Sequence, residues 1–391
     1  MGSVNSQSGL PVEPSPLEQP LFCGTVGQER ALAILKRALE SGPAHAYLFT
    51  GPSGVGKQEA AFDFAAAICC EQRGCGSCPV CRRVREGIHP DVEVVSPDGT
   101  FITVDQIREI NRDVALRPFE ARARVILIFE AEAMNEPAAN AFLKTLEEPP
   151  AHAHFVLVTD HPEQLLETIV SRCQRVPFSQ VPAGPLADHL RERYTLSDVQ
   201  AMAFARVSGG NLEQARRLAT SEAAREHREQ LLSWARQVPE GGLHAVHITV
   251  DDMLAAIEAQ AEERVRELEQ GRERDLDWAA DARSRARVER LYDQRIRRER
   301  RRAVADGVEE ALDTFTGWYR DLAFVALGAE AAVRNHDFLY ELRNEAFPGM
   351  IDSYLEAVRI VKRAQDRFRY NVDTRSILED MILGMKEALL S

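Results

Sequence analysis

The chain has 391 residues, of which 45% are hydrophobic and 28% charged, and its formal net charge at pH 7 is −13. This length allows two or three domains that each bury a core, and no apolar run approaches the ~18 residues that span a bilayer. The acidic charge makes this chain a poor DNA binder on its own, because strong sequence-independent binding rests on Lys and Arg.

Residues 1–18 lack the basic start and the apolar stretch of a secretory signal. We therefore expect a disordered tail at 1–18, a cytoplasmic protein and no contact with a membrane.

Residues 21–178 alternate short apolar segments with helical segments. The segments AYLFT (46–50), DVEVV (91–95), RVILIF (124–129) and HFVLVT (154–159) are typical of strands buried on both faces of a parallel sheet. The segments between them, such as VGQERALAILKRALESG and NEPAANAFLKTLEEPP, have helical spacing and end at Gly or Pro. This pattern predicts an α/β domain with a parallel sheet.

The segment GPSGVGKQ follows the first predicted strand and opens a helix, which is the context of a P-loop. In such a loop, backbone N–H groups surround phosphates at a helix N-terminus and the lysine reaches the outer phosphates. A Gly-rich turn without function is the alternative. The predicted phosphate-binding residues are Gly51, Pro52, Ser53, Gly54, Val55, Gly56, Lys57 and Gln58.

Two positions depart from what ATP hydrolysis requires. Gln58 stands where a Ser or Thr hydroxyl would ligate Mg²⁺. Phe129 stands at the end of the strand VILIF, where an Asp would hold the metal, and the Glu that would orient the attacking water follows as Glu130. Because phosphoryl transfer depends on that metal, the sequence allows ATP or ADP binding, gives poor support for Mg²⁺ and predicts weak hydrolysis with a vestigial Glu130.

Five of the seven cysteines lie between residues 69 and 81, namely Cys69, Cys70, Cys75, Cys78 and Cys81. Zinc prefers tetrahedral thiolate ligands, and a C-x-x-C turn presents two thiolates to one ion. Without a signal peptide, such clustering favours a metal over disulfides. The predicted ligands of a closed, structural zinc site are Cys70, Cys75, Cys78 and Cys81, with Cys69 and His89 as substitutes for Cys70; free thiols are the alternative.

Beyond residue 177 the strand signals nearly vanish. Residues 186–220 are typical of a small helical unit with an SGGN turn at 208–211, and most of 221–391 has helical spacing. Residues 262–302 are dominated by Arg and Glu, which predicts a solvated helical arm held by i,i+4 ion pairs. A nucleic-acid patch at RIRRERRR (295–302) is the weaker alternative.

In this order, the segments resemble the bacterial DNA polymerase III clamp-loader subunits of the delta-prime type, which are AAA+ proteins. The matching phrases are VGQERALAILKRAL, HAYLFTGPSGVGK, GIHPDV after the cysteines, ITVDQIREI, EAEAMNEPAANAFLKTLEEPP, LLETIVSRCQRVPF and SGGNLEQARR. The similarity covers roughly residues 22–217 and extends more faintly to NVDTRSILEDMIL, which looks like the end of the family's collar domain. Residues 262–302 look like an insertion.

The resemblance implies an AAA+ P-loop domain at 19–180 with a zinc module at 69–81, a helical lid at 181–220 and an all-α collar domain at 221–391. The Ser-Arg-Cys motif of the family carries an arginine finger, so Arg172 would act in trans on a neighbour's γ-phosphate. Arg216 matches the second sensor, and Thr159 and Asp160 fall where the first sensor lies. Thr159 and Arg216 thus join Gly51–Gln58 as expected nucleotide-binding residues. A solvated surface arginine is the alternative at 172 and 216.

The resemblance further implies a subunit that helps to load the sliding clamp onto primed DNA within the DNA-directed DNA polymerase III holoenzyme, with little or no ATPase activity of its own. The implied partners are gamma/tau-type motor subunits, the delta subunit, the sliding clamp and, through the complex, primed DNA. The alternative is a gamma/tau-type motor that hydrolyses ATP in cis with Lys57 and Glu130, which Gln58 and Phe129 disfavour. A DNA-binding zinc protein is disfavoured by the acidic charge.

Overall fold

The computed structural model describes residues 21–97, 101–238, 242–278, 282–369 and 373–390, so the tail expected at 1–18 lies outside the described residues. The chain divides into two compact units, Met1–Arg216 and Arg217–Ser391, and each is described by itself. Among the described residues, no helix is both long and apolar enough to cross a membrane.

The first unit is built on a five-stranded sheet in the order β2-β3-β4-β1-β5, in which every neighbouring pair is parallel. The strands are β1 (Ala46–Thr50), β2 (Val92–Val95), β3 (Arg124–Ile128), β4 (Ala153–Thr159) and β5 (Gln174–Pro177). The predicted parallel sheet is confirmed. The fifth strand was not predicted from the sequence, and only Val176 of its four residues is buried.

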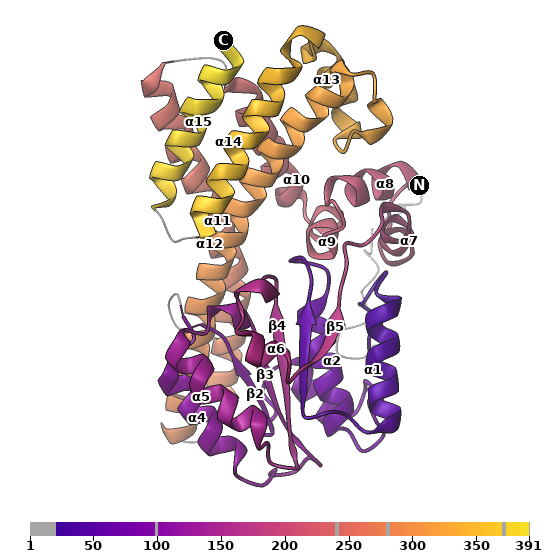
Figure 1. Cartoon of the computed structure of the whole chain (residues 1–391), viewed down its shortest axis with the longest axis vertical. Helices are drawn as coiled ribbons and strands as arrows, with labels where there is room; N and C mark the ends of the chain where they lie inside the picture. Colours follow the sequence, from indigo (N-terminus) through magenta and orange to yellow (C-terminus); the bar gives the residue numbers. More distant parts are fainter. Residues whose placement is uncertain (1–20, 98–100, 239–241, 279–281, 370–372, 391) are drawn as a thin grey trace, which may run out of the picture. The chain divides into compact units, whose positions relative to one another are not determined.

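Both faces of the sheet are covered by helices, which explains the uninterrupted apolar runs. Helices α1 (Glu29–Ser41) and α2 (Lys57–Cys69) lie on one side of the strands, and α4 (Val104–Val114) and α5 (Glu136–Glu147) lie on the other (Figure 1). Because side chains alternate along a strand, Phe49 packs in the same core as Phe64 of α2, whereas Leu48 packs with Phe142 of α5.

Shorter helices complete the first unit. They are α3 (Pro79–Arg85), α6 (Glu167–Val170), α7 (Ala183–Arg193), α8 (Asp198–Val207) and α9 (Leu212–Thr220), whose last residues enter the second unit. The SGGN turn between α8 and α9 packs tightly, since a Cβ on Gly210 would lie 2.8 Å from the Val181 carbonyl oxygen, and Gly210 has φ 90°. Glycine is therefore required at this turn, which fixes where α9 begins.

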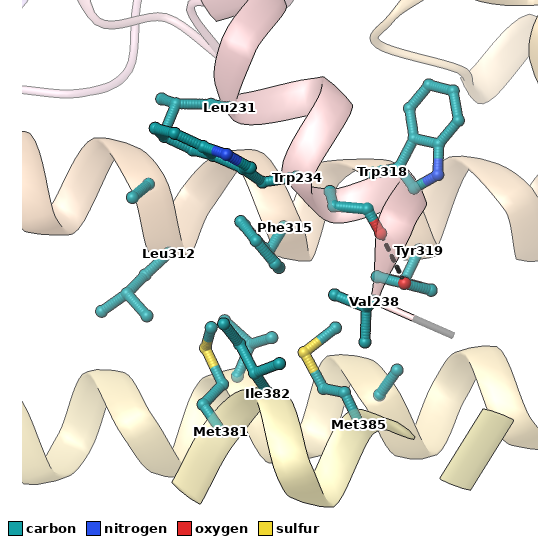
Figure 2. Close-up of a cluster of buried hydrophobic side chains, with 14 of the residues drawn as sticks. Leu231, Trp234, Val238, Leu312, Phe315, Trp318, Tyr319, Met381, Ile382 and Met385 are labelled. Carbon is teal, nitrogen blue, oxygen red and sulfur yellow. Dashed lines mark hydrogen bonds between the residues drawn. The ribbon is translucent and has the colours of Figure 1, made fainter. Parts of the chain in front are cut away.

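Within its described residues, the second unit consists of helices and their connections, as the periodicity beyond residue 221 predicted. The helices are α10 (Glu222–Gln237), α11 (Leu243–Trp278), α12 (Ala282–Ala326), α13 (Leu339–Glu345), α14 (Ile351–Arg369) and α15 (Thr374–Leu390). Figure 2 shows the part of their core that α10, α12 and α15 share, in which Phe315 of α12 lies between Trp234 of α10 and Met381 of α15. The Tyr319 hydroxyl donates a buried hydrogen bond of 2.7 Å to the Ala235 carbonyl (Figure 2).

Within the described residues, the charged segment 262–302 lies on α11 and α12. The ion pairs of its described side chains run mostly between these two helices, whereas the sequence predicted pairs between positions i and i+4 of one helix. Arg264 of α11 contacts both Glu299 (3.2 Å) and Asp306 (3.1 Å) of α12. Further along, Arg272 contacts Asp293 at 3.2 Å. Ion pairs that remain partly exposed to water contribute about 0–1 kcal/mol each, so these contacts add little to the stability of the two helices.

Phe315→Ala should destabilise the second unit by about 3–5 kcal/mol, because a buried ring leaves a cavity that the core cannot refill. All three tryptophans of the chain lie in the second unit, so denaturant unfolding followed by tryptophan fluorescence reports on that unit alone. Tyr340→Ala, at a side chain that is 75% exposed, is the matched control and should change the unfolding free energy by less than about 0.5 kcal/mol. A loss below 1 kcal/mol for Phe315→Ala would show that this ring is not a core residue.

Candidate functional site

The P-loop connects β1 to α2 at the edge of the sheet where the parallel strands end. Gly51, Gly54 and Gly56 have φ values of 143°, 69° and 90°, which side chains with a Cβ rarely adopt. Lys57 is the first residue of α2, and only 5% of it is exposed. The predicted strand, loop and helix are therefore all present in this order.

The Lys57 ammonium contacts three acceptor groups of the protein. Its Nζ atom donates to the carbonyl oxygens of Gly51 (2.6 Å) and Pro52, and it forms an ion pair of 2.6 Å with the Asp160 carboxylate. Asp160 immediately follows β4, which is paired with β1 so that Thr159 lies opposite Thr50. This register brings Asp160 beside the P-loop.

The beginning of α9 contacts the same loop. The Gly54 carbonyl accepts hydrogen bonds from the backbone N–H groups of Leu212 (2.7 Å) and Glu213 (3.4 Å). A Cβ on Gly54 would lie 2.1 Å from the Asn211 Oδ1 atom. Glycine at position 54 thus allows the start of α9 to approach the P-loop backbone.

Arg216, the expected second sensor, lies four residues into α9. Burial favours its neutral form, but a hydrogen bond with Tyr194 and the negative charge of Glu59 raise the pKa of Arg216. Glu59 belongs to the first turn of α2. Arg216 therefore lies near the start of α2 and is already engaged by neighbouring side chains.

Phe129, which directly follows β3 where an Asp would hold the metal, is a core residue. Phe129 is 6% exposed, and its ring centroid lies 5.6 Å from that of Phe62 on α2. Glu130 follows with an exposed side chain and a left-handed backbone at φ 51°. A carboxylate at position 129 is thus replaced by an aromatic contact between β3 and α2.

A second carboxyl group near this site was not predicted from the sequence. The Glu132 Oε1 atom accepts from the Asp160 backbone N–H at 3.4 Å. Burial raises the pKa of Glu132, while a hydrogen bond with the Thr159 side chain lowers it. Thr159, the expected first sensor, is therefore occupied by Glu132 on one side, and its Oγ1 atom accepts from the His161 N–H (3.0 Å) on the other.

Arg172 is not part of the P-loop cluster. It follows α6, and its Nη2 atom forms an ion pair of 2.6 Å with Glu147 at the end of α5. Its Nη1 atom donates to the Thr168 carbonyl at 3.0 Å. Its side chain remains 35% exposed, so the guanidinium is oriented by these two contacts and still accessible.

The cysteine module brings four sulfur atoms together. The Sγ atoms of Cys70, Cys75, Cys78 and Cys81 all lie within 4.8 Å of one another. Cys70 Sγ is 3.9 Å from Cys75 Sγ and 3.7 Å from Cys78 Sγ. Four sulfurs placed ~2.3 Å from one zinc ion in a tetrahedron would be separated by about 3.8 Å, so the spacing fits a closed zinc site.

The backbone of the module also favours thiolates. Hydrogen bonds from the backbone N–H groups of Ser77 and Cys78 lower the pKa of Cys75 to about 6. The Cys81 N–H donates to Cys78 Sγ at 3.4 Å. Metal ligation by cysteine requires the thiolate form, which these N–H groups favour, whereas burial raises the pKa of Cys78 and Cys81 and opposes it.

Cys69 and His89, the predicted substitutes for Cys70, lie apart from the four clustered sulfur atoms. Cys69 Sγ is directed at the Ala123 carbonyl oxygen at 3.9 Å, and burial raises the pKa of Cys69 to about 12. His89 is buried with its Nε2 atom 3.3 Å from Glu120. Neither is grouped with the four clustered sulfurs in the described part of the chain, which favours Cys70 as the fourth ligand.

Two arginines attach the module to the rest of the domain. Arg122 donates to the Cys70 carbonyl at 2.7 Å. Arg85 of α3 forms a largely buried ion pair of 2.7 Å with Asp63 of α2, which also accepts from the Phe22 N–H. The module is therefore braced against the helix that begins at Lys57.

A parallel sheet with helices on both faces and a P-loop after β1 defines the class of P-loop proteins. Comparison with known proteins is more specific. The family model described as DNA polymerase III, delta subunit matches residues 27–182. DNA polymerase III subunit delta' of Bacillus subtilis (strain 168) is 26% identical over 364 residues, which cover 92% of this chain and 96% of that protein.

Other relatives match over shorter stretches. DNA polymerase III subunit delta' of Pseudomonas aeruginosa is 34% identical over 202 residues, covering 50% of this chain and 61% of that protein. DNA polymerase III subunit tau of Bacillus subtilis is 36% identical over 200 residues, which cover 49% of this chain and 34% of that protein. The chain is thus similar to delta' and tau subunits of DNA polymerase III, and to the delta' subunit of Bacillus subtilis over nearly its whole length.

Removing one clustered thiol should remove the metal. We expect purified full-length chain to carry about one zinc per molecule, and Cys75→Ala to carry far less and to unfold at a lower temperature. Cys69→Ala is the matched control and should keep its zinc, because its sulfur lies outside the cluster. Metal analysis after dialysis, together with thermal unfolding with and without a chelator, checks both. Loss of zinc from Cys69→Ala would instead make Cys69 a ligand.

Proposed function

We propose that this chain acts as the delta-prime-like subunit of a DNA polymerase III clamp loader and helps to load the sliding clamp onto primed DNA. The observation that carries the proposal is the alignment with a delta-prime subunit over 92% of this chain and 96% of that protein. Its partners would be gamma/tau-type motor subunits, the delta subunit and the clamp. The alignments with tau subunits cover only part of those proteins. They support a P-loop region shared with the tau subunits and do not support a motor role for this chain.

Within that assembly, the chain would contribute to ATP hydrolysis without performing it. Gln58 and Phe129 stand where a Ser or Thr hydroxyl and an Asp carboxylate hold Mg²⁺ in this class of site. The guanidinium of Arg172 offers five N–H donors, and two of them are used by Glu147 and Thr168. The remaining donors are suited to a γ-phosphate bound by a neighbouring motor subunit.

Contact with DNA would come mainly from the partners. The net charge of −13 opposes sequence-independent binding to a polyanion. The zinc, in turn, would be structural, because four cysteine ligands leave no open position for a reacting group. Both features are consistent with an assembly role.

Arg172→Ala should lower ATP turnover by the reconstituted complex about tenfold or more, because an arginine finger stabilises charge in the transition state. The complex would contain the motor and delta subunits of the same organism, the clamp and primed DNA. Arg175→Ala is the matched control, since Arg175 is an exposed arginine of the neighbouring strand β5. The isolated chain should show almost no ATP hydrolysis. Brisk hydrolysis by the isolated chain, with no effect of Arg172→Ala, would favour a motor that uses Lys57 and Glu130 in cis.

Glu147→Ala should also lower turnover by the complex, because Glu147 orients the Arg172 guanidinium. The loss should be smaller than for Arg172→Ala, and the double variant should be no slower than Arg172→Ala alone, since coupled residues are not additive. Glu148→Ala, at the adjacent exposed carboxylate, is the control. Additive losses in the double variant would show that Glu147 acts independently of Arg172.

A further inference from the structure

Helices α11 and α12 lie side by side and continue beyond the core of the second unit (Figure 1). Gly271 of α11 faces Tyr292 of α12, since a Cβ on this glycine would lie 3.2 Å from the tyrosine hydroxyl. Among the described residues, buried side chains end at Val265 on α11 and resume at Ala303 on α12. The part of the pair at 266–302 is therefore a solvated arm.

The charges of this arm are divided unevenly between its two helices. From 262 to 278, α11 carries seven acidic residues and four arginines, whereas from 283 to 302, α12 carries ten arginines and three acidic residues. Two of those three carboxylates, Asp293 and Glu299, form ion pairs with arginines of α11. Most of the negative charge of this part of α12 is therefore neutralised by α11, and the arginines of α12 are in excess.

Five of these arginines share one side of α12. They stand three, four or seven residues apart, which is the spacing of one helix face, and they form the arginine face: Arg283, Arg287, Arg290, Arg297 and Arg301. Arg297 and Arg301 are exposed. Each is two residues, or about 200° around the helix, from Glu299, which contacts α11. At these described side chains the arginine face thus lies opposite α11, and its whole length is about 27 Å.

We propose that the arginine face binds the phosphate backbone of duplex DNA without reading its sequence. Guanidinium groups match phosphate oxygens in both geometry and charge. A face about 27 Å long spans about eight base pairs of a duplex, which carries one negative charge per ~1.7 Å of its axis. The inference goes beyond the proposed function, because it gives this chain a DNA contact of its own, and it does not require assembly into a clamp loader.

Other occupants fit the arginine face less well. The cores of protein interfaces are depleted of charged residues and enriched in aromatic ones, whereas every position of the arginine face is charged. Single-stranded nucleic acid is bound by aromatic side chains on which the bases stack. The aromatic residue of this part of α12 is Tyr292, and it faces Gly271 of α11. The charge pattern therefore favours a duplex, which is bound through its phosphates.

The net charge of −13 weakens this binding without cancelling it. Salt at about 0.1 M limits the reach of an exposed charge to about 10 Å. A face about 27 Å long therefore responds mainly to the charges close to it. We expect binding that is weak at physiological salt, with a Kd of about 10⁻⁴ to 10⁻⁶ M, and that strengthens steeply as salt is removed.

Binding of a labelled duplex to the full-length chain, followed by fluorescence anisotropy between about 50 and 200 mM salt, tests the proposal. We expect saturable binding of the wild type at the low end of this range. Arg297→Ala combined with Arg301→Ala should weaken binding at least about tenfold and should make the slope of log affinity against log salt shallower by about two. Arg297→Lys combined with Arg301→Lys keeps both charges and should retain the salt slope.

Arg359 and Arg363 of α14 provide the matched control. They are also exposed and four residues apart on one helix of the second unit, but both are paired with Glu356. Arg359→Ala combined with Arg363→Ala should therefore bind the duplex as the wild type does. Circular dichroism and thermal unfolding would show that each double variant is folded.

Three results would overturn the proposal. The first is wild-type binding that is absent at about 50 mM salt or insensitive to salt. The second is a folded double alanine variant at 297 and 301 that binds the duplex as tightly as the wild type. The third is polyglutamate of equal charge that binds the wild type as tightly as the duplex does, which would assign the arginine face to an acidic protein instead.

Discussion

Because β4 lies between β1 and β3 and all three strands run in the same direction, the segments that follow them meet at one edge of the sheet. This constraint brings together Lys57, Phe129 and Asp160, which are far apart in the sequence. The same edge would hold a nucleotide and its metal in an active ATPase. In this chain the architecture of that site is kept, while its charges are satisfied within the protein. Arg172, whose side chain is 35% exposed, is not among the residues that contact Lys57.

Helix α2 connects this edge to the cysteine module. It begins at Lys57 and ends at Cys69, directly before the first clustered thiol, and Asp63 in its middle holds Arg85 of the module. The cysteine module is too short to bury enough apolar surface to fold by itself. A closed metal site would hold such a segment in one conformation. Order in the module and order in α2 are therefore linked through a few buried polar contacts.

The sequence predicted those features whose signal is local. Four strands were apparent because burial on both faces makes them apolar runs, and the P-loop and the cysteine cluster were apparent from their spacing. Strand β5 was missed because only Val176 of its residues is buried, which leaves no pattern. The contacts of Asp160 with Lys57 and of Glu147 with Arg172 join positions separated by 103 and 25 residues. Such pairs depend on the strand order and on helix placement, which a single sequence does not specify.

Phe129 also opposes the introduction of a metal ligand by a single substitution. An aspartate at position 129 would place a carboxylate in a position that is 6% exposed, against the ring of Phe62 and with Lys57 already paired to Asp160. An unpaired buried charge destabilises a fold strongly, so selection would act against this substitution before further changes could make it useful. The packing of the core at the end of β3 therefore preserves the aromatic residue found there.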